Sequence, residues 1–143
     1  MPETRVTPAG NDRLRGLGTV LIAVYAILAL AATARSVFQI LVQFDEAPVA
    51  YLLSAVSGVV YILATIALIA PGRGWRGVAW ATISFELVGV LVVGTLSVVD
   101  RSLFPDAAVW SVYGEGYGFI PLVLPVLGLL WLRHRARLDP SGA

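Results

Sequence analysis

The chain has 143 residues, of which 58% are hydrophobic and 13% are charged, and its formal net charge at pH 7 is +1. Globular proteins are about 45–50% apolar and about 25% charged, so a water-soluble fold could not bury this much apolar surface. The sequence contains no cysteine, which excludes disulfides, thiolate nucleophiles and cysteine-ligated metals. The composition therefore predicts a single membrane domain with short polar ends.

The chain begins with a polar segment, residues 1–15, that is expected to form a disordered cytoplasmic tail. The first apolar segment, 16–40, is long enough for a membrane span, which needs about 20 residues. A basic leader, an apolar stretch and Ala32-Thr33-Ala34 also fit a signal peptide that would be cleaved to remove residues 1–34. The apolar character continues through Val42, and this favours an uncleaved span.

Two further apolar segments predict spans at 49–71 and 76–99. Pro71 and Gly72 predict a turn between these spans, because proline removes a backbone donor and glycine permits a tight turn. Residues 138–143 form the second polar tail.

A fourth apolar segment, 118–133, is short for a span and contains Pro121 and Pro125, which lie four residues apart on one helix face. Each proline frees a backbone carbonyl, so a helix kink is expected at these positions. Kinked half-helices occur in transporter binding sites, but proline kinks also occur in structural helices.

The segment before the fourth span predicts a short helix in the outer loop. Pro105-Asp106 would begin it, with Asp106 as the cap, and Gly114 would end it. Trp110 and Tyr113 are then expected at the level of the lipid headgroups. The glycine-rich residues 114–118 either extend the fourth span or separate it from this helix, and we favour the separation.

These elements predict an all-α fold: a four-transmembrane-helix bundle with a short helix in the outer loop before the fourth span. Its orientation follows from the arginines, because the chain has no lysine. One side of the spans holds eight arginines and the other holds Arg35 and Arg101. The eight are Arg5, Arg13, Arg15, Arg73, Arg76, Arg133, Arg135 and Arg137. The positive-inside rule therefore predicts a multi-pass protein of the cell membrane with both termini in the cytoplasm.

Glu86 lies near the middle of the third span and is the only acidic residue that the bilayer would bury deeply. Counting about 1.5 Å per residue from the cytoplasmic ends places Glu86, Tyr25 and Tyr61 at a similar depth, roughly 13–15 Å. Thr82 precedes Glu86 by one helical turn and lies on the same face. These four residues form the predicted buried polar site, a possible proton or ligand site.

A carboxyl at that depth is expected to keep its proton, because the charged form is disfavoured in lipid and no cation is predicted at its level. Glu86 would then act either as structural glue between helices or as a protonatable relay or substrate contact. Small and polar residues at three- and four-residue spacing give each of the first three spans a packing face. These faces comprise Gly18, Tyr25, Ala29 and Ala32; Ser54, Ser57, Gly58, Tyr61, Ala64 and Thr65; and Thr82, Glu86, Gly89 and Val93.

Arg35 is expected near the outer boundary, about 28 Å above the cytoplasmic end of the first span. Glu115 would lie at nearly the same height if the fourth helix were continuous, so an ion pair between Arg35 and Glu115 is predicted. The alternative is an arginine that extends alone into the headgroups.

The sequence offers no catalytic site, metal or cofactor. His134 is the only histidine and lies among arginines, whereas metal and haem sites need several ligands. The glycines at 114, 116 and 118 lack the lysine and the serine or threonine of a phosphate loop. The basic residues flank spans, so nucleic acid is not an expected partner; the lipid bilayer is.

Residues 110–132 read WSVYGEGYGFIPLVLPVLGLLWL. Together with the four-span layout and the lysine-free composition, this segment resembles the small integral membrane proteins of unknown function that are common in actinobacteria. The resemblance implies a four-helix membrane protein but no particular chemistry. Small multidrug transporters also have four short helices and one membrane glutamate, but that glutamate lies in their first span, whereas Glu86 lies in the third.

Two functional hypotheses follow from the sequence. The leading hypothesis is a non-catalytic accessory or assembly module that associates with itself or with a larger membrane complex through small-residue helix faces. The alternative is a small proton-coupled transporter that uses Glu86 as its protonatable carboxylate.

Overall fold

The computed structural model describes residues 9–138, and this part of the chain is helical, with no strand. Four α-helices make up most of it: α1 (Ala9–Gln43), α2 (Pro48–Ile69), α3 (Arg73–Val99) and α4 (Ile120–Leu138). Three short 3₁₀ segments lie in the connections: η1 (Phe44–Glu46), η2 (Arg101–Leu103) and η3 (Ser111–Tyr117). The predicted all-α class is confirmed.

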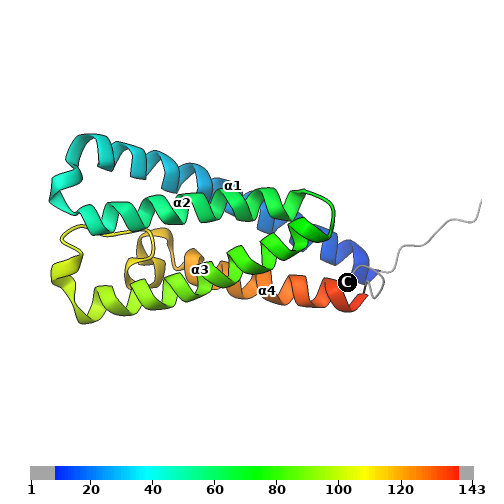
Figure 1. The fold of residues 1–143 in the computed structure, drawn as a ribbon. Helices are drawn as coiled ribbons and strands as arrows, with labels where there is room; N and C mark the ends of the chain where they lie inside the picture. Colours follow the sequence, from blue (N-terminus) through cyan, green and yellow to red (C-terminus); the bar gives the residue numbers. More distant parts are fainter. Residues whose placement is uncertain (1–8, 139–143) are drawn as a thin grey trace, which may run out of the picture.

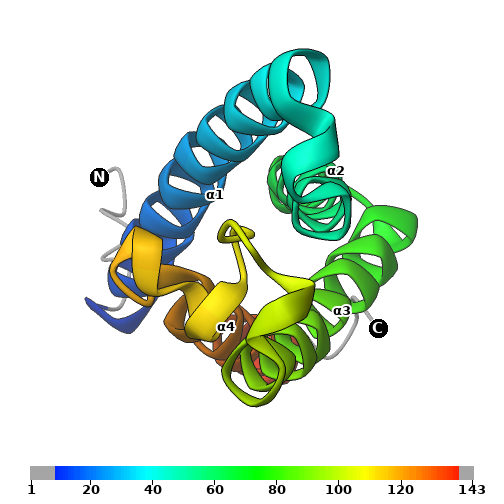
Figure 2. The same cartoon turned by 90° about the vertical axis from the view of Figure 1, so that its left-hand side faces the viewer.

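The helices run alternately up and down and surround a common core (Figure 1). Seen from the end in Figure 2, α1, α2, α3 and α4 follow one another around the bundle. α1 packs along α2, and α3 packs against both α2 and α4. α1 and α4 approach each other closely where Trp131 covers Gly18. We call the end that carries the α2–α3 turn and the carboxyl end of α4 the arginine-rich end, and the end that carries η1 and η2 the opposite end.

The helix boundaries follow from local backbone chemistry. Pro48 occupies the first turn of α2, where its missing N–H group has no helical partner in any case. Ala70 precedes Pro71 and has extended backbone angles, which end α2. Gly72 then adopts a φ of 112°, a conformation that residues with a Cβ atom rarely adopt, and α3 begins directly after it.

Three helices are long and apolar enough to cross a membrane: Arg15–Glu46, Pro48–Ile69 and Arg73–Val99. A fourth span is present if η3 and α4 are taken together, although they are bent by 99° at the break between them. Large apolar side chains project from the bundle on every helix, among them Leu30, Leu41, Val99 and Leu130. An exposed apolar surface of this extent is expected of a protein surrounded by lipid.

The first helix begins before the predicted start of the first span. α1 starts at Ala9, so the predicted disordered tail 1–15 is wrong for residues 9–15, whereas residues 1–8 lie outside the described residues. At the other end, Leu138 belongs to α4, and 139–143 of the predicted tail 138–143 lie outside the described residues.

The outer loop differs most from the prediction. The predicted α-helix from Ala107 to Tyr113 does not form, because η3 begins only at Ser111. Residues 104–119 instead turn into the bundle between the helix ends, as the yellow segment in Figure 2 shows. We call residues 104–119 the inserted segment. Asp106 does not cap a helix, because its carboxylate accepts the Tyr51 hydroxyl and the Ala107 N–H group.

Serine hydroxyls of α2 and α3 bond to the irregular backbone of the inserted segment. The N–H group of Val109 donates to Ser54 Oγ of α2 at 3.0 Å, and the N–H group of Val112 donates to Ser97 Oγ of α3 at 2.7 Å. Backbone donors at membrane depth need internal partners, and these hydroxyls replace the bonds that a helix would supply. The serines of two spans therefore hold this backbone in place.

Trp110 is buried inside the bundle, contrary to the prediction of a headgroup-level ring, whereas the predicted headgroup level of the half-buried Tyr113 stays a prediction. Trp110 is only 2% exposed, and its ring lies over Gly89 of α3. Tyr113 covers Gly94 of the same helix. Gly114 does not end a helix either, because it lies inside η3 with a φ of 85° and packs against Pro121. The two glycines of α3 thus provide the space that the aromatic rings fill.

We predict that Ser54→Ala lowers the free energy of unfolding by about 1–2 kcal/mol, because it leaves the Val109 N–H group buried without an acceptor. Ser57→Ala is the matched control, since the Ser57 hydroxyl donates only to the Ser54 carbonyl of its own helix. Unfolding in mixed detergent micelles measures the first effect, and hydrogen exchange should be faster in the inserted segment of Ser54→Ala alone. Equal effects of both substitutions would contradict the assigned role of Ser54.

Candidate functional site

The candidate site is a cluster of four side chains at the centre of the bundle: Tyr25 of α1, Tyr61 of α2, Glu86 of α3 and Trp110 of the inserted segment. Tyr25, Tyr61 and Glu86 are 0% exposed. We call these four residues the aromatic–carboxyl cluster. It joins three helices and the inserted segment at one depth.

Two hydrogen bonds connect the cluster. The Tyr25 hydroxyl donates to Glu86 Oε2 at 2.6 Å, and Trp110 Nε1 donates to the Tyr61 hydroxyl at 2.7 Å. The Tyr25 and Tyr61 rings lie 6.2 Å apart between centroids, and the Tyr61 and Trp110 rings lie 6.5 Å apart, nearly edge to face. Ring pairs at these separations attract one another in addition to burying apolar area.

The structure thus brings together three of the four predicted site residues, Tyr25, Tyr61 and Glu86. Thr82 does not join them, because its hydroxyl donates to the Val78 carbonyl of its own helix. Trp110 is the member that sequence reasoning missed, since the loop was assigned to the headgroup level. Gly89 could have indicated it, because a glycine one turn after Glu86 leaves space for a large side chain, and the Trp110 ring fills that space.

Glu86 Oε1 is buried and has no hydrogen-bond partner. Glu86 also forms no ion pair with any residue that the structure describes. A charged carboxylate in these surroundings would have one oxygen, Oε1, that accepts no hydrogen bond. A neutral carboxyl can instead carry its proton on Oε1 and accept the hydrogen bond of the Tyr25 hydroxyl at Oε2. The arrangement therefore suits a carboxyl that holds its proton while the cluster is closed.

The two prolines of α4 have different effects. Pro121 lies in the first turn of α4, where proline is tolerated, so only Pro125 removes a donor inside the helix. The sharp bend comes before both of them, between η3 and α4, where Gly118 and Phe119 have φ values of 64° and 61°. The bend therefore lies where the favoured separation of the fourth span by the glycine-rich residues 114–118 was predicted, whereas the kink expected at the two prolines stays a prediction.

Arg35 has a partner other than the predicted one. Its Nη2 atom donates to the Ala107 carbonyl at 3.1 Å, and it forms no ion pair with Glu115 within residues 9–138. The prediction assumed a continuous fourth helix that would bring Glu115 to the height of Arg35. The bend between η3 and α4 removes that continuity.

A second polar group at the opposite end was not predicted from the sequence. Gln43 Nε2 donates to the Tyr51 hydroxyl at 3.1 Å, and that hydroxyl donates to Asp106 Oδ2 at 2.9 Å. With the Arg35 bond, these contacts attach the start of the inserted segment to α1 and α2. The partners lie up to 72 positions apart in the chain, so no local pattern could reveal them.

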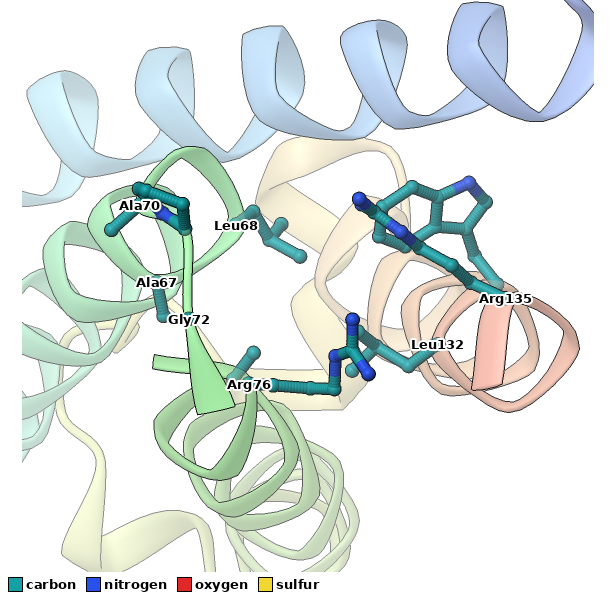
Figure 3. A pocket seen from close by; sticks show the side chains of 10 residues that line it. Ala67, Leu68, Ala70, Gly72, Arg76, Leu132 and Arg135 are labelled. Carbon is teal, nitrogen blue, oxygen red and sulfur yellow. The ribbon is translucent and has the colours of Figure 1, made fainter. Parts of the chain in front are cut away.

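A small crevice lies at the arginine-rich end between the α2–α3 turn and α4 (Figure 3). Arg76 and Arg135 extend toward it from α3 and α4, respectively. Arg135 also lies over the Trp131 ring, 5.1 Å from its centroid. The crevice has a volume of about 60 Å³, which suits one or two water molecules but not a metabolite.

Within residues 9–138, no group of three or more histidine, cysteine, aspartate and glutamate side chains could hold a metal ion. No protein-family model, curated protein or solved structure matches the chain. The resemblance to small actinobacterial membrane proteins therefore stays a prediction.

We predict that Gly89→Ala lowers the free energy of unfolding by about 1–3 kcal/mol, the usual range for overpacking. A Cβ atom at this position would lie 2.9 Å from Cη2 of the Trp110 ring and would displace the indole from Tyr61. Gly16→Ala on α1 is the control, because no atom lies within 4 Å of its added Cβ. Near-ultraviolet circular dichroism should report altered aromatic packing in Gly89→Ala, and an unchanged spectrum and stability would count against the cluster.

Proposed function

We propose that the chain is a non-catalytic integral membrane protein with four spans that serves as an accessory or assembly module. The observation that carries this proposal is the complete burial of the aromatic–carboxyl cluster. Tyr25, Tyr61 and Glu86 are 0% exposed, whereas a substrate site is normally a concave, accessible pocket. Glu86 then serves as a polar link between α3 and α1.

The proposed topology takes η3 and α4 as one broken fourth span. Both termini would then lie on the same side, at the arginine-rich end. The distribution of arginines supports the cytoplasm as that side, because this end has seven of the nine arginines within residues 9–138.

The small-residue faces predicted to mediate association are used inside the bundle. Gly58 lies against Thr33 of α1, and Ala64 is 0% exposed. An assembly module therefore needs another surface. The exposed small residues Gly74, Gly77 and Ala81 follow one another at three- and four-residue spacing on α3, and we propose self-association there.

If α3 mediates self-association, Ala81→Leu should shift the protein toward monomers, because a larger side chain keeps the helix backbones apart. Ala34→Leu on α1 makes the same change at an exposed position on another helix and should leave association unchanged. Counting photobleaching steps of single labelled particles in lipid bilayers measures the subunit number. A protein that is monomeric before substitution, or that loses association equally in both variants, does not use this surface.

The second candidate, a small proton-coupled transporter, has one observation in its favour: the unpartnered Oε1 atom of Glu86. A membrane carboxyl with a free oxygen is able to exchange its proton when the cluster opens. The positive φ values of Val112 and Tyr113, 49° and 60°, also place backbone strain in the inserted segment. Such strain is typical of segments that change conformation.

Glu86→Gln separates the two candidates, because glutamine still accepts the Tyr25 hydroxyl but cannot exchange a proton. A module should keep its fold, its subunit number and a low proton flux in liposomes that contain a pH-sensitive dye. A transporter should show a proton flux that the substitution reduces by about tenfold or more. Glu115→Gln, the same change at an exposed carboxyl outside the cluster, controls for the loss of a carboxyl elsewhere in the protein.

A further inference from the structure

An apolar groove runs between α1 and α4 at the arginine-rich half of the bundle. Leu21 and Trp131 form its floor and are almost buried, whereas Leu17, Leu127 and Leu130 form exposed walls. Its volume is about 250 Å³, and His134 closes it toward the arginine-rich end. The groove therefore opens to the surface that lipid would cover.

A second, wider hollow of about 540 Å³ lies next to this groove, on α4. Its lining comprises Leu130, Arg133, His134 and Arg137, so Leu130 and His134 belong to both hollows. Arg133 and Arg137 form no ion pair within the described part of the chain. The α4 sequence, Ile120–Leu138, contains no acidic residue that could neutralise them.

We propose that the two hollows together form a binding site for one anionic phospholipid. An acyl chain would occupy the groove between α1 and α4, and the headgroup phosphate would contact Arg133 and Arg137. Basic pockets between membrane helices are a recognised type of site for anionic headgroups. This inference is independent of the proposed assembly function.

The order of residues along α4 fits the order of groups in a phospholipid. Leu127, Leu130, His134 and Arg137 follow one another at three- and four-residue spacing, so they lie along one helix face. Arg137 lies ten positions after Leu127, a rise of about 15 Å, which covers the change from hydrocarbon to headgroup. Apolar side chains therefore lie deep, and cations lie at the surface.

Charge complementarity identifies the occupant as anionic. The carbonyl groups at the end of α4 carry partial negative charge, which by itself repels a phosphate. Binding must then depend on the guanidinium groups, so a lipid with a net negative headgroup should be preferred over a zwitterionic lipid with the same chains. Inorganic phosphate lacks the acyl chain and should bind weakly.

The test uses the purified full-length protein in mild detergent, with lipid binding measured by native mass spectrometry. The probes are phosphatidylglycerol, phosphatidylcholine with the same acyl chains, and inorganic phosphate. We expect retention of phosphatidylglycerol. The double change Arg133→Gln and Arg137→Gln should weaken it about 25-fold, or about fivefold for each arginine, without affecting phosphatidylcholine.

One further test variant and two controls complete the experiment. Arg73→Gln removes the same charge at the same end of the bundle but outside both hollows, and it should leave phosphatidylglycerol binding unchanged. Leu127→Trp should fill the groove and weaken both lipids, whereas Val126→Trp, at an exposed position outside the groove, should not.

Equal retention of the two lipids would overturn the proposal, and so would a loss in Arg73→Gln as large as the loss per arginine in the double variant. Retention of inorganic phosphate as strong as that of phosphatidylglycerol would show an anion site without a lipid groove and would also overturn it.

Discussion

The structure depends on one constraint: a polar group inside the bilayer must find its partner within the protein. Glu86 meets it at one of its two carboxyl oxygens, Oε2, whereas Oε1 has no partner. Its carboxyl lies at the centre of α3, and the Tyr25 hydroxyl of α1 meets it at 2.6 Å. Lipid gives helices no hydrophobic reason to associate, so a hydrogen bond of this kind, together with close packing at small residues, selects which helix faces meet. The small-residue faces of α1, α2 and α3 therefore point toward the core, and the leucine, isoleucine and valine faces remain outside.

The irregular backbone of the inserted segment also finds hydrogen-bond partners within the protein. Its Val109 and Val112 N–H groups bond to hydroxyls of Ser54 and Ser97, and the Arg35 guanidinium binds the Ala107 carbonyl. Irregular backbone at membrane depth is tolerated only where protein surrounds it. The left-handed conformations of Val112 and Tyr113 are unfavourable in isolation, so the surrounding contacts must offset their cost. The loop is consequently part of the bundle interior.

The positions that depend only on the regular rise of an α-helix could be predicted from the sequence. Counting residues along ideal helices was enough to place Tyr25 beside Glu86, because both lie inside long uninterrupted α-helices. It failed for Glu115 and Trp110, whose positions depend on the bend between η3 and α4 and on contacts with Gly89 and Tyr61. Those contacts join residues far apart in the chain, and a headgroup aromatic and a buried aromatic have the same local sequence pattern. For Trp110, the buried position is distinguished only by the space that Gly89 leaves on α3.

The aromatic–carboxyl cluster connects the centre of the bundle to the opposite end. Contacts pass from Glu86 to Tyr25, from Tyr25 to the Tyr61 ring, and from Tyr61 to Trp110 of the inserted segment. A displacement of the Glu86 carboxyl must therefore alter packing at the base of the inserted segment, and a displacement of that segment must alter the surroundings of Glu86. The two candidate functions require opposite properties of this connection. An assembly module needs it to be permanent, so that the bundle presents a fixed surface, whereas a transporter needs Trp110 to leave Tyr61 so that water reaches the carboxyl. The lifetime of the Trp110–Tyr61 bond is consequently the physical quantity on which the choice between them depends.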